Sequence, residues 1–317
     1  MKTQPTYWKK YDLVFKHFSY KRVYKEIFKI ARALGQPFTK KGRRGRNFKA
    51  EPYEYAAYIA FEIITHNSPY RDMELGSELY LGEHIDHSTF GKNFIRIPYL
   101  YFQRLLRRIA SLLESLLGKA LLYISDSTGL LTNIYEDSIH AGEESCRKKT
   151  YKAHSLIGYY PNKRITYIKD AEGTNKHISD TEGVKRMLRT YELKGSYLLA
   201  DRGYDFETTY QAAHRAGLTP IIKKQKKASG RKSKHRRRSK FIGNIYKEIR
   251  GIIETVFGGL ENKGLLHTRL RRNDNIEKFG VIIQIRHNLM TYIKEKITQT
   301  IYNLTRINRQ TLIFQKN

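Results

Sequence analysis

The hydrophobic pattern of the sequence changes its period once, near Lys119. From Glu51 to Leu117 the apolar residues recur at helical spacing, for example at Leu105, Ile109 and Leu112. After Lys119 the apolar runs become short, β-branched and aromatic, and turn residues separate them. A helical part followed by mixed strands and helices predicts an α/β fold with a mixed central sheet, preceded by an all-α region.

The part after the change in period has a definite predicted order. Strands are expected at 120–125, 151–160 and 164–169, with a hairpin at Pro161-Asn162, then a helix from Asp180 or Thr181 and a short buried strand at 196–200. Further helices are expected from Phe206 to Gly217, from Asn244 to Asn262 and from Asn275 to Lys296. The order strand, hairpin, helix, strand places a sheet at the centre of this region.

A pair of helices is also predicted within the all-α part. A helix from Asp72 to Leu81 precedes a short one whose N-cap is Asp86 or Ser88, and the short helix carries Lys92, Asn93 and Arg96. Side chains of these three types contact base edges or phosphates in helix-turn-helix proteins. An ordinary surface helix explains the same residues equally well.

The net charge points to nucleic acid as a partner. Lys and Arg number 60 against 30 Asp and Glu, so the formal net charge is +30, which attracts polyanions. The basic residues concentrate in a linker near 38–50 and in a loop at 223–240, which includes Arg236, Arg237 and Arg238. Each segment is either a solvated connector or a contact for DNA phosphates.

Two aspartates follow predicted strands. Asp126 comes directly after the strand at 120–125, and Asp201 comes directly after the strand at 196–200. Either residue alone is ordinary turn chemistry. Two carboxylates on neighbouring strands repel each other unless a cation neutralises them, so the pair favours Mg²⁺ or Mn²⁺ with oxygen ligands.

A third acid lies on the helix that begins near Asn244. Tyr246, Arg250 and Glu254 follow one another at spacings of four and share one helix face. A simple Arg–Glu pair along the helix is the alternative explanation. Glu261 lies seven residues beyond Glu254 on the same face and is the rival third ligand.

Three motifs together resemble those of a known family. They are DST at Asp126, LLADRGYD around Asp201 and YKEIRGIIETVFGGLE around Glu254, separated by 75 and 53 residues. With DHSTFGKNFIRI, RKKTYKAHSLIGY and NKHISDTEGVKRML, they resemble the DDE transposases of bacterial and archaeal insertion sequences over residues 75–295. In two places the sequence departs from a common family pattern, at the spacing of Tyr246 from Arg250 and at Glu261, which stands where a lysine is usual.

The resemblance implies a ribonuclease-H-like catalytic domain that cleaves and joins DNA strands. It implies two Mg²⁺ or Mn²⁺ ions per active site, held by Asp126, Asp201 and Glu254. It also implies DNA contacts from Arg250, Arg202, Tyr246 and Lys263. Double-stranded DNA, both the element's terminal inverted repeats and the target, is the expected partner, and the chain is expected to act as a homodimer on DNA.

The predicted organisation is a helical DNA-binding domain at 1–118, a catalytic domain at 119–300 and a tail at 301–317. A nuclease of the same fold without strand transfer, or a non-catalytic DNA-binding relative, remains the alternative. No apolar run approaches the roughly 18–20 residues that span a bilayer, and the first residues lack an apolar leader. We therefore expect a cytoplasmic protein that does not bind membranes.

Overall fold

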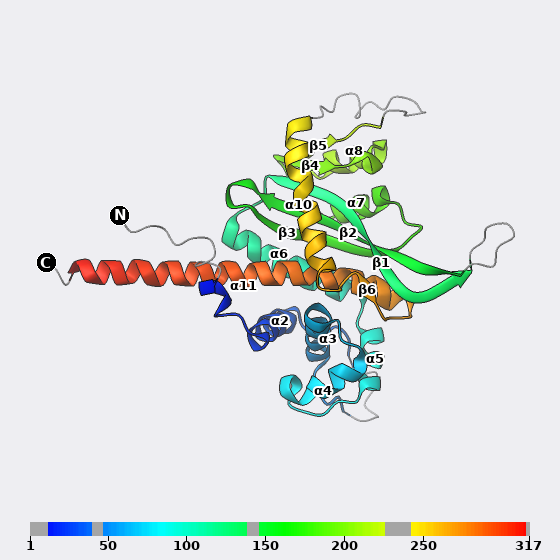
Figure 1. Ribbon diagram of the computed structural model, residues 1–317, viewed down its shortest axis with the longest axis vertical. Helices are drawn as coiled ribbons and strands as arrows, with labels where there is room; N and C mark the ends of the chain where they lie inside the picture. The colour runs from blue at the N-terminus through cyan, green and yellow to red at the C-terminus, as the bar shows by residue number, and fades with distance from the viewer. Residues whose placement is uncertain (1–11, 40–46, 138–145, 226–241, 315–317) are drawn as a thin grey trace.

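The computed structural model describes residues 12–39, 47–137, 146–225 and 242–314, and Figure 1 shows how its elements are arranged. The first part is helical, as predicted. Its helices are α2 (Tyr20–Leu34), α3 (Pro52–His66), α4 (Tyr70–Leu81), α5 (His87–Arg96) and α6 (Tyr99–Leu117). Asp86 is the N-cap of α5, because its side chain accepts a hydrogen bond from the backbone N–H of Ser88 at 2.8 Å. The predicted helix pair is therefore present as α4 and α5.

The second part is built on one mixed sheet. Its strands are β1 (Leu122–Asp137), β2 (Cys146–Tyr160), β3 (Ile165–Asn175), β4 (Ser196–Ala200), β5 (Leu218–Ile222) and β6 (His267–Thr268). The sheet order is β3-β2-β1-β4-β5, and β6 pairs with β1. Strands β1, β2 and β3 are antiparallel, whereas β4 and β5 run parallel to β1 and to each other. A short 3₁₀ turn, η1 (Pro161–Lys163), closes the predicted hairpin.

Strand β1 is longer than the sequence pattern predicted. The sequence pattern ends this strand at Ser125, yet the strand continues to Asp137. The reason is that β2 pairs with β1 as far as Asp137, while β4 pairs only with Leu122 to Ile124. Asp126 therefore lies within a strand, at the point where its parallel neighbour leaves it.

Side chains of the central strands alternate between two cores. Ile124 and Leu199 point into the core formed with α10 (Gly243–Glu261), α11 (Asn273–Phe314) and the N-terminal helices. Tyr123 and Leu198 point into the opposite core, formed with α7 (Asp180–Leu188) and α8 (Glu207–Arg215). Because a strand presents successive side chains to opposite faces, the sheet is covered by helices on both sides.

Helix boundaries differ from the predictions at two places. The N-cap of α7 is Ser179, whose hydroxyl accepts from the backbone N–H of Glu182, and not Asp180 or Thr181. Helix α11 does not end at Lys296 but continues to Phe314, into the predicted tail. It packs against α6 and β3 as well as α3, and so joins the helical part to the sheet. Among the described residues, no helix is long and apolar enough to cross a membrane.

Candidate active site

The register of β1 and β4 brings two predicted aspartates to equivalent positions. Ile124 pairs with Leu199 in the parallel ladder, and Asp126 and Asp201 each follow two residues later. Neighbouring strands lie about 4.8 Å apart, so the two carboxylates leave the same edge of the sheet side by side. This is the carboxyl edge, where open α/β sheets place their ligands.

Helix α10 brings the third acid to this edge. Its buried residues Ile253, Val256 and Leu260 pack in the core on the sheet face, which holds the helix across the strands (Figure 1). Glu254 follows Ile253 and is exposed. A cavity of about 100 Å³ is lined by Ile124, Ser125, Asp126, Leu199, Ala200, Asp201, Tyr246, Ile253 and Glu254. Three acids from distant segments thus share one cavity.

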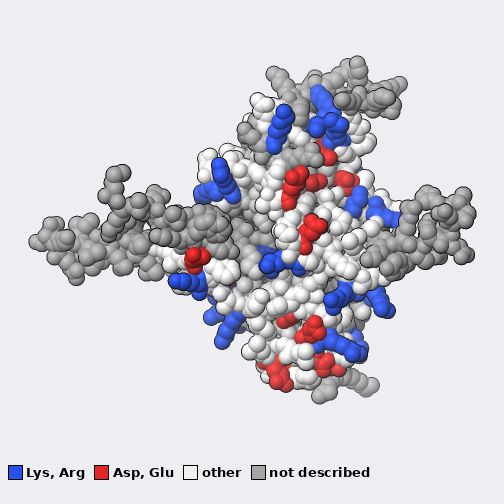
Figure 2. Space-filling model, viewed as in Figure 1, with Lys and Arg blue, Asp and Glu red and all other residues white. Residues whose placement is uncertain are grey.

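Backbone N–H groups orient both aspartates. The N–H of Ser127 donates to Asp126 Oδ1 at 2.8 Å, and the N–H of Gly203 donates to Asp201 Oδ1 at 2.7 Å. Asp126 is half-exposed and Asp201 is exposed, so solvent reaches both. Figure 2 shows acidic side chains gathered over α10 and the neighbouring sheet edge, with basic side chains around them. On this face the acidic group therefore has basic side chains near it.

A buried tyrosine lies next to the acids. Tyr204 belongs to the short 3₁₀ turn η2 (Arg202–Tyr204) that follows Asp201, and it is only 2% exposed. Burial raises its pKa well above the ordinary value, and the nearby carboxylates of Asp126 and Asp180 raise it further. The hydroxyl therefore stays protonated and uncharged, which leaves the negative charge of the site to the carboxylates.

Asp180, the first residue of α7, anchors a polar network next to Asp126. Its Oδ1 accepts from Ser127 Oγ at 2.8 Å and from Lys152 Nζ at 3.1 Å. His154 Nδ1 lies 3.7 Å from the same oxygen, and the His154 side chain is fully buried. Burial lowers the pKa of His154 to about 4, so this imidazole is neutral at neutral pH. The sequence predicted Asp180 only as a possible helix cap, and its hydrogen bonds to Ser127 and Lys152 were not predicted.

The family of the chain follows from a match that covers this region. The family model of the transposase DDE domain matches residues 118–289, which is more than half of the chain. The chain belongs to the DDE transposase family. The match includes all three acids of the cavity and the whole sheet. No curated protein matches the sequence.

The family assignment confirms the predicted fold class. The DDE transposase domain is ribonuclease-H-like, and the mixed sheet with helices on both faces, preceded by a helical region, agrees with it. The assignment also makes the chain a nuclease or transposase of the DDE type.

The chemistry of the cavity in this DDE transposase fits divalent metal ions, which the family generally uses. Its three acids supply only carboxylate oxygens, the ligands that Mg²⁺ and Mn²⁺ prefer. Their ligand atoms do not all lie within 4.8 Å of one another, a condition that Glu74, Asp86 and His87 alone meet among the described residues.

The two candidate glutamates of the transposase lie at different places on α10. Glu254 lines the cavity, whereas Glu261 is the last residue of the helix and is not among the lining residues. Seven residues of helix correspond to about 10 Å along its axis. The geometry therefore favours Glu254 as the third acid.

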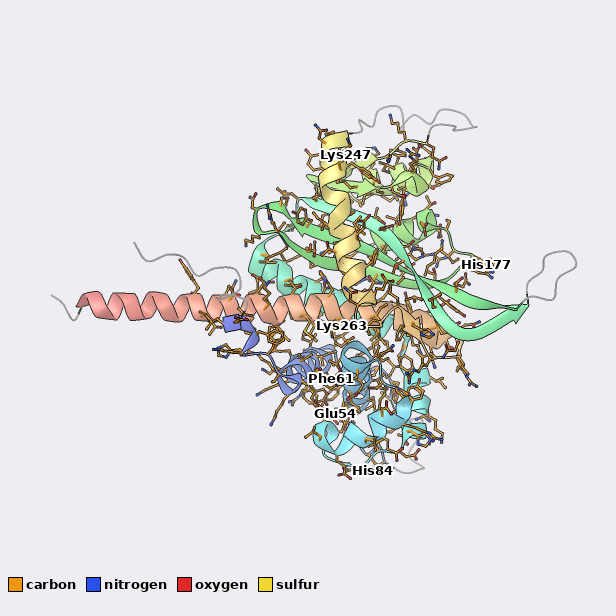
Figure 3. All side chains as sticks on the ribbon, viewed as in Figure 1. Glu54, Phe61, His84, His177, Lys247 and Lys263 are labelled. Carbon is orange, nitrogen blue, oxygen red and sulfur yellow. The ribbon has the colours of Figure 1, made fainter. Side chains whose placement is uncertain are left out.

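The residues predicted to contact DNA near the cavity differ in their surroundings. Tyr246 lines the cavity and is 8% exposed, with Lys223 Nζ 5.4 Å from its ring centre. Arg202 is exposed directly after Asp201. Lys263 lies beyond the end of α10, opposite the end that carries Lys247 (Figure 3), and it is not a lining residue of the cavity. Arg250 belongs to α10, but its side chain lies outside the described residues.

Two of the three residues of α5 that were predicted to contact DNA are exposed to solvent. Lys92 and Arg96 are exposed one turn apart on α5. Asn93 is 2% exposed and lies on the buried face with Phe90 and Phe94, so its side chain is not presented on the surface of α5. Arg236, Arg237 and Arg238 lie outside the described residues.

Proposed function

We propose that this chain is a transposase that binds the ends of an insertion sequence and catalyses metal-dependent strand cleavage and strand transfer. The observation that carries the proposal is the shared cavity of Asp126, Asp201 and Glu254 at the carboxyl edge of the sheet. Family membership supplies the general activity, and the cavity supplies a place for the reaction within this chain.

In this proposal Asp126, Asp201 and Glu254 hold two Mg²⁺ or Mn²⁺ ions. Bound there, the ions would activate water or a 3′-hydroxyl and stabilise the leaving oxygen of a phosphoryl transfer. The N–H groups of Ser127 and Gly203 hold the two aspartates in fixed orientations before any ligand arrives. The protein thus contributes orientation and negative charge.

The DNA would lie across the face that carries the cavity. Arg202 and Arg250 are candidates for contacts with the scissile phosphate, and Lys263 with the flanking backbone. Lys92 and Arg96 on α5 would contact the element's ends, and the loop at 223–240 would follow phosphates. Each chain offers one such cavity, and an element has two ends, so a homodimer on DNA supplies the second site.

A strand-transfer assay tests the proposal. The purified full-length chain is mixed with labelled duplex DNA that carries the terminal inverted repeats flanking its gene, supercoiled target plasmid and Mg²⁺ or Mn²⁺. We expect labelled ends to be joined to the plasmid, with no product after chelation of the metal or from Asp126→Asn.

Two other outcomes would contradict the proposal, and each would support a different function. Cleaved ends that are never joined to plasmid would indicate a nuclease of the same fold. Specific binding of the ends without cleavage in either metal would indicate a non-catalytic relative. An unrelated duplex of equal length controls for the preference for ends.

A further inference from the structure

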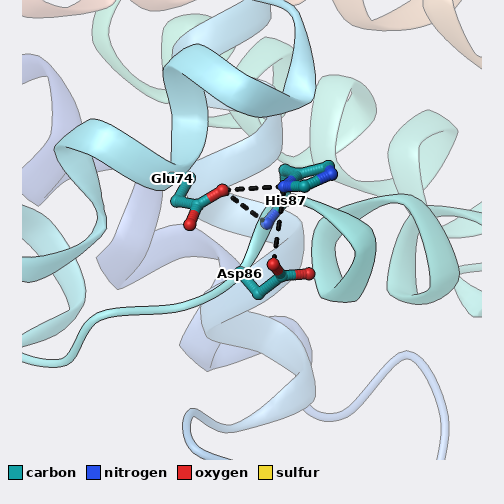
Figure 4. A group of neighbouring side chains, drawn as sticks. All are labelled: Glu74, Asp86 and His87. Atoms are coloured by element: carbon teal, nitrogen blue, oxygen red, sulfur yellow. Dashed lines mark hydrogen bonds and ion pairs between the residues drawn. The ribbon is translucent and has the colours of Figure 1, made fainter.

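A second group of metal-ligating side chains lies in the helical part, away from the sheet edge (Figure 4). Glu74 comes from the second turn of α4, Asp86 ends the connection between α4 and α5, and His87 begins α5. Each offers one ligand atom, and these atoms all lie within 4.8 Å of one another. His84, in the same connection, has its Nε2 at 3.2 Å from Glu74 Oε1. The group joins the two helices at their connection.

We propose that Glu74, Asp86 and His87 bind a Zn²⁺ ion that fastens α4 to α5, and that His84, which contacts the other oxygen of Glu74, turns toward the ion as a fourth ligand. Imidazole nitrogens with carboxylate oxygens are a common donor set for zinc, whereas Mg²⁺ favours oxygen ligands alone. This site is independent of the catalytic cavity.

The distances within the group are close to those of a tetrahedral site. Zinc bonds of about 2.0–2.1 Å place neighbouring ligand atoms roughly 3.3 Å apart. His87 Nδ1 lies 2.8 Å from Glu74 Oε2 and 3.5 Å from Asp86 Oδ2. These side chains are partly exposed, so small rotations open the shorter distance and leave a path for the ion.

The ion-pair partners of the two carboxylates in this group are imidazoles, which are metal ligands themselves. Within the part of the chain that the structure describes, neither Glu74 nor Asp86 forms an ion pair with a lysine or arginine, although basic residues outnumber acids two to one. Hydrogen bonds from His87 lower the pKa of Glu74, and those from Ser88 lower the pKa of Asp86. Both acids are ionised at neutral pH and carry the negative charge that a bound metal ion would neutralise.

The backbone around the ligands is held in place without the ion. Ser77, a buried residue of α4, accepts the backbone N–H of Ile85 at 2.9 Å. Lys49 Nζ donates to the carbonyl of His84 at 2.7 Å. Asp86 uses Oδ1 for the helix cap and keeps Oδ2 on the side of His87. Preorganisation of this kind reduces the cost of ordering the ligands when the ion binds.

Metal binding to the full-length protein tests the proposal. After removal of metal with a chelator, we titrate ZnCl₂ by calorimetry and repeat the titration with Co²⁺ to follow its visible absorption. Because the catalytic acids also bind divalent ions, the reference protein is Asp126→Asn/Asp201→Asn, in which that cavity is disabled. We expect it to bind one Zn²⁺ and to give the Co²⁺ spectrum of a tetrahedral site.

Ligand variants in that reference protein give the decisive comparison. His87→Ala and Glu74→Gln should each weaken zinc binding by about 100-fold or more. Mutation of residues that only hydrogen-bond to a metal ligand already lowers metal affinity by about 10–100-fold, and loss of a ligand itself should cost more. His177→Ala is the matched control, because His177 is exposed and lies outside the group, and it should bind zinc normally. Unchanged zinc binding in His87→Ala and Glu74→Gln would overturn the proposal.

Chemical protection covers the case in which a ligand variant fails to fold. Zinc should protect His84 and His87 of the reference protein from diethyl pyrocarbonate, while His177 reacts equally with and without zinc. Equal modification of His84 and His87 in both conditions would also overturn the proposal. Neither readout depends on transposition activity.

Discussion

The sheet carries acidic residues of two kinds, and their surroundings differ sharply. Asp170 on β3 is fully buried, and Arg107 of α6 donates to both of its oxygens, at 2.9 and 2.8 Å. Asp126 and Asp201 lie at the carboxyl edge, reach solvent and share a cavity with Glu254. The first acid has its counter-charge within the fold, which makes it part of the connection between α6 and the sheet. The edge acids face a cavity that a ligand can enter, and in the proposed function they bind metal ions there rather than stabilise the fold.

The largest expected effect comes from neutralising the two aspartates at the sheet edge. Asp126→Asn and Asp201→Asn should each lower the rate of cleavage of end DNA by about 1,000-fold or more, because a bound metal supplies several kcal/mol of transition-state stabilisation. The free energy of unfolding should change by no more than about 0.5 kcal/mol, as is usual for surface positions. Cleavage kinetics and urea denaturation of the same preparations measure the two effects.

A variant that cleaves at a near-normal rate would remove its residue from the site. A variant that is inactive because it is unfolded would make that aspartate structural, like Asp170, and would erase the contrast between the two kinds of acid.

Disrupting the buried ion pair of Arg107 and Asp170 should have the opposite effect, a loss of folding stability. Arg107→Ala leaves Asp170 as an uncompensated buried charge and should lower the free energy of unfolding by about 3–5 kcal/mol. The double variant Arg107→Met/Asp170→Leu removes both charges and should be destabilised much less. Urea denaturation distinguishes the two, and equal destabilisation of both variants would show that packing rather than charge matters here.

The folding of the sheet was largely predictable from local pattern, whereas its long-range pairing was not. The strand at 196–200 and the hairpin at Pro161 follow from composition. The extension of β1 beyond Asp126 does not, because residues such as Gly129 and Asn133 have low strand propensity and only partners distant in sequence hold them. Gly129 pairs with Lys152 of β2, and a hydrogen bond of 2.7 Å joins Asn133 Oδ1 to His267 Nε2 of β6. Pro220 is tolerated in β5 because that strand lies at the edge of the sheet.

The candidate site shows the same division. The motifs at Asp126, Asp201 and Glu254 could be found because each has a local sequence context. The network of Asp180 with Lys152 and His154 could not, since it joins α7 to β2 across the fold. The burial of Asn93 could likewise not be predicted, because a single sequence does not show which face of a short amphipathic helix packs inward.

The buried histidine near the edge acids, His154, should make folding stability depend on pH. His154 has a pKa of about 4 in the folded chain, against about 6.5 when unfolded, so the unfolded state binds more protons between these values. Stability should therefore fall as the pH drops from about 6.5 to about 4, by up to roughly 3 kcal/mol for this residue. His154→Gln removes the titrating group and should flatten that part of the pH–stability curve. An unchanged slope in His154→Gln would show that other groups cause it.

The smallest effects are expected from the basic residues that are proposed to contact DNA. Neutralising Arg236, Arg237 and Arg238 should weaken binding equally for end and unrelated DNA, and should flatten its salt dependence by up to about 0.9 for each phosphate that is no longer neutralised. Lys92→Ala with Arg96→Ala should instead reduce the preference for ends, by about 1–3 kcal/mol for each base that the helix no longer reads. Binding titrations at several salt concentrations measure both, and the reverse pattern would exchange the two assignments.

In the proposed function three acids from distant segments form one metal-dependent site, and α10 contributes the third acid. Two glutamates on α10 provide a matched pair, since Glu254 lines the cavity and Glu261 ends the helix. The measurement is cleavage of labelled end DNA over a range of Mg²⁺ concentrations by Glu254→Gln and Glu261→Gln, with equal DNA binding verified first. We predict that Glu261→Gln cleaves like the unmodified chain and that Glu254→Gln yields no product at any Mg²⁺ concentration. Cleavage by Glu254→Gln together with loss of activity in Glu261→Gln would contradict the site described above.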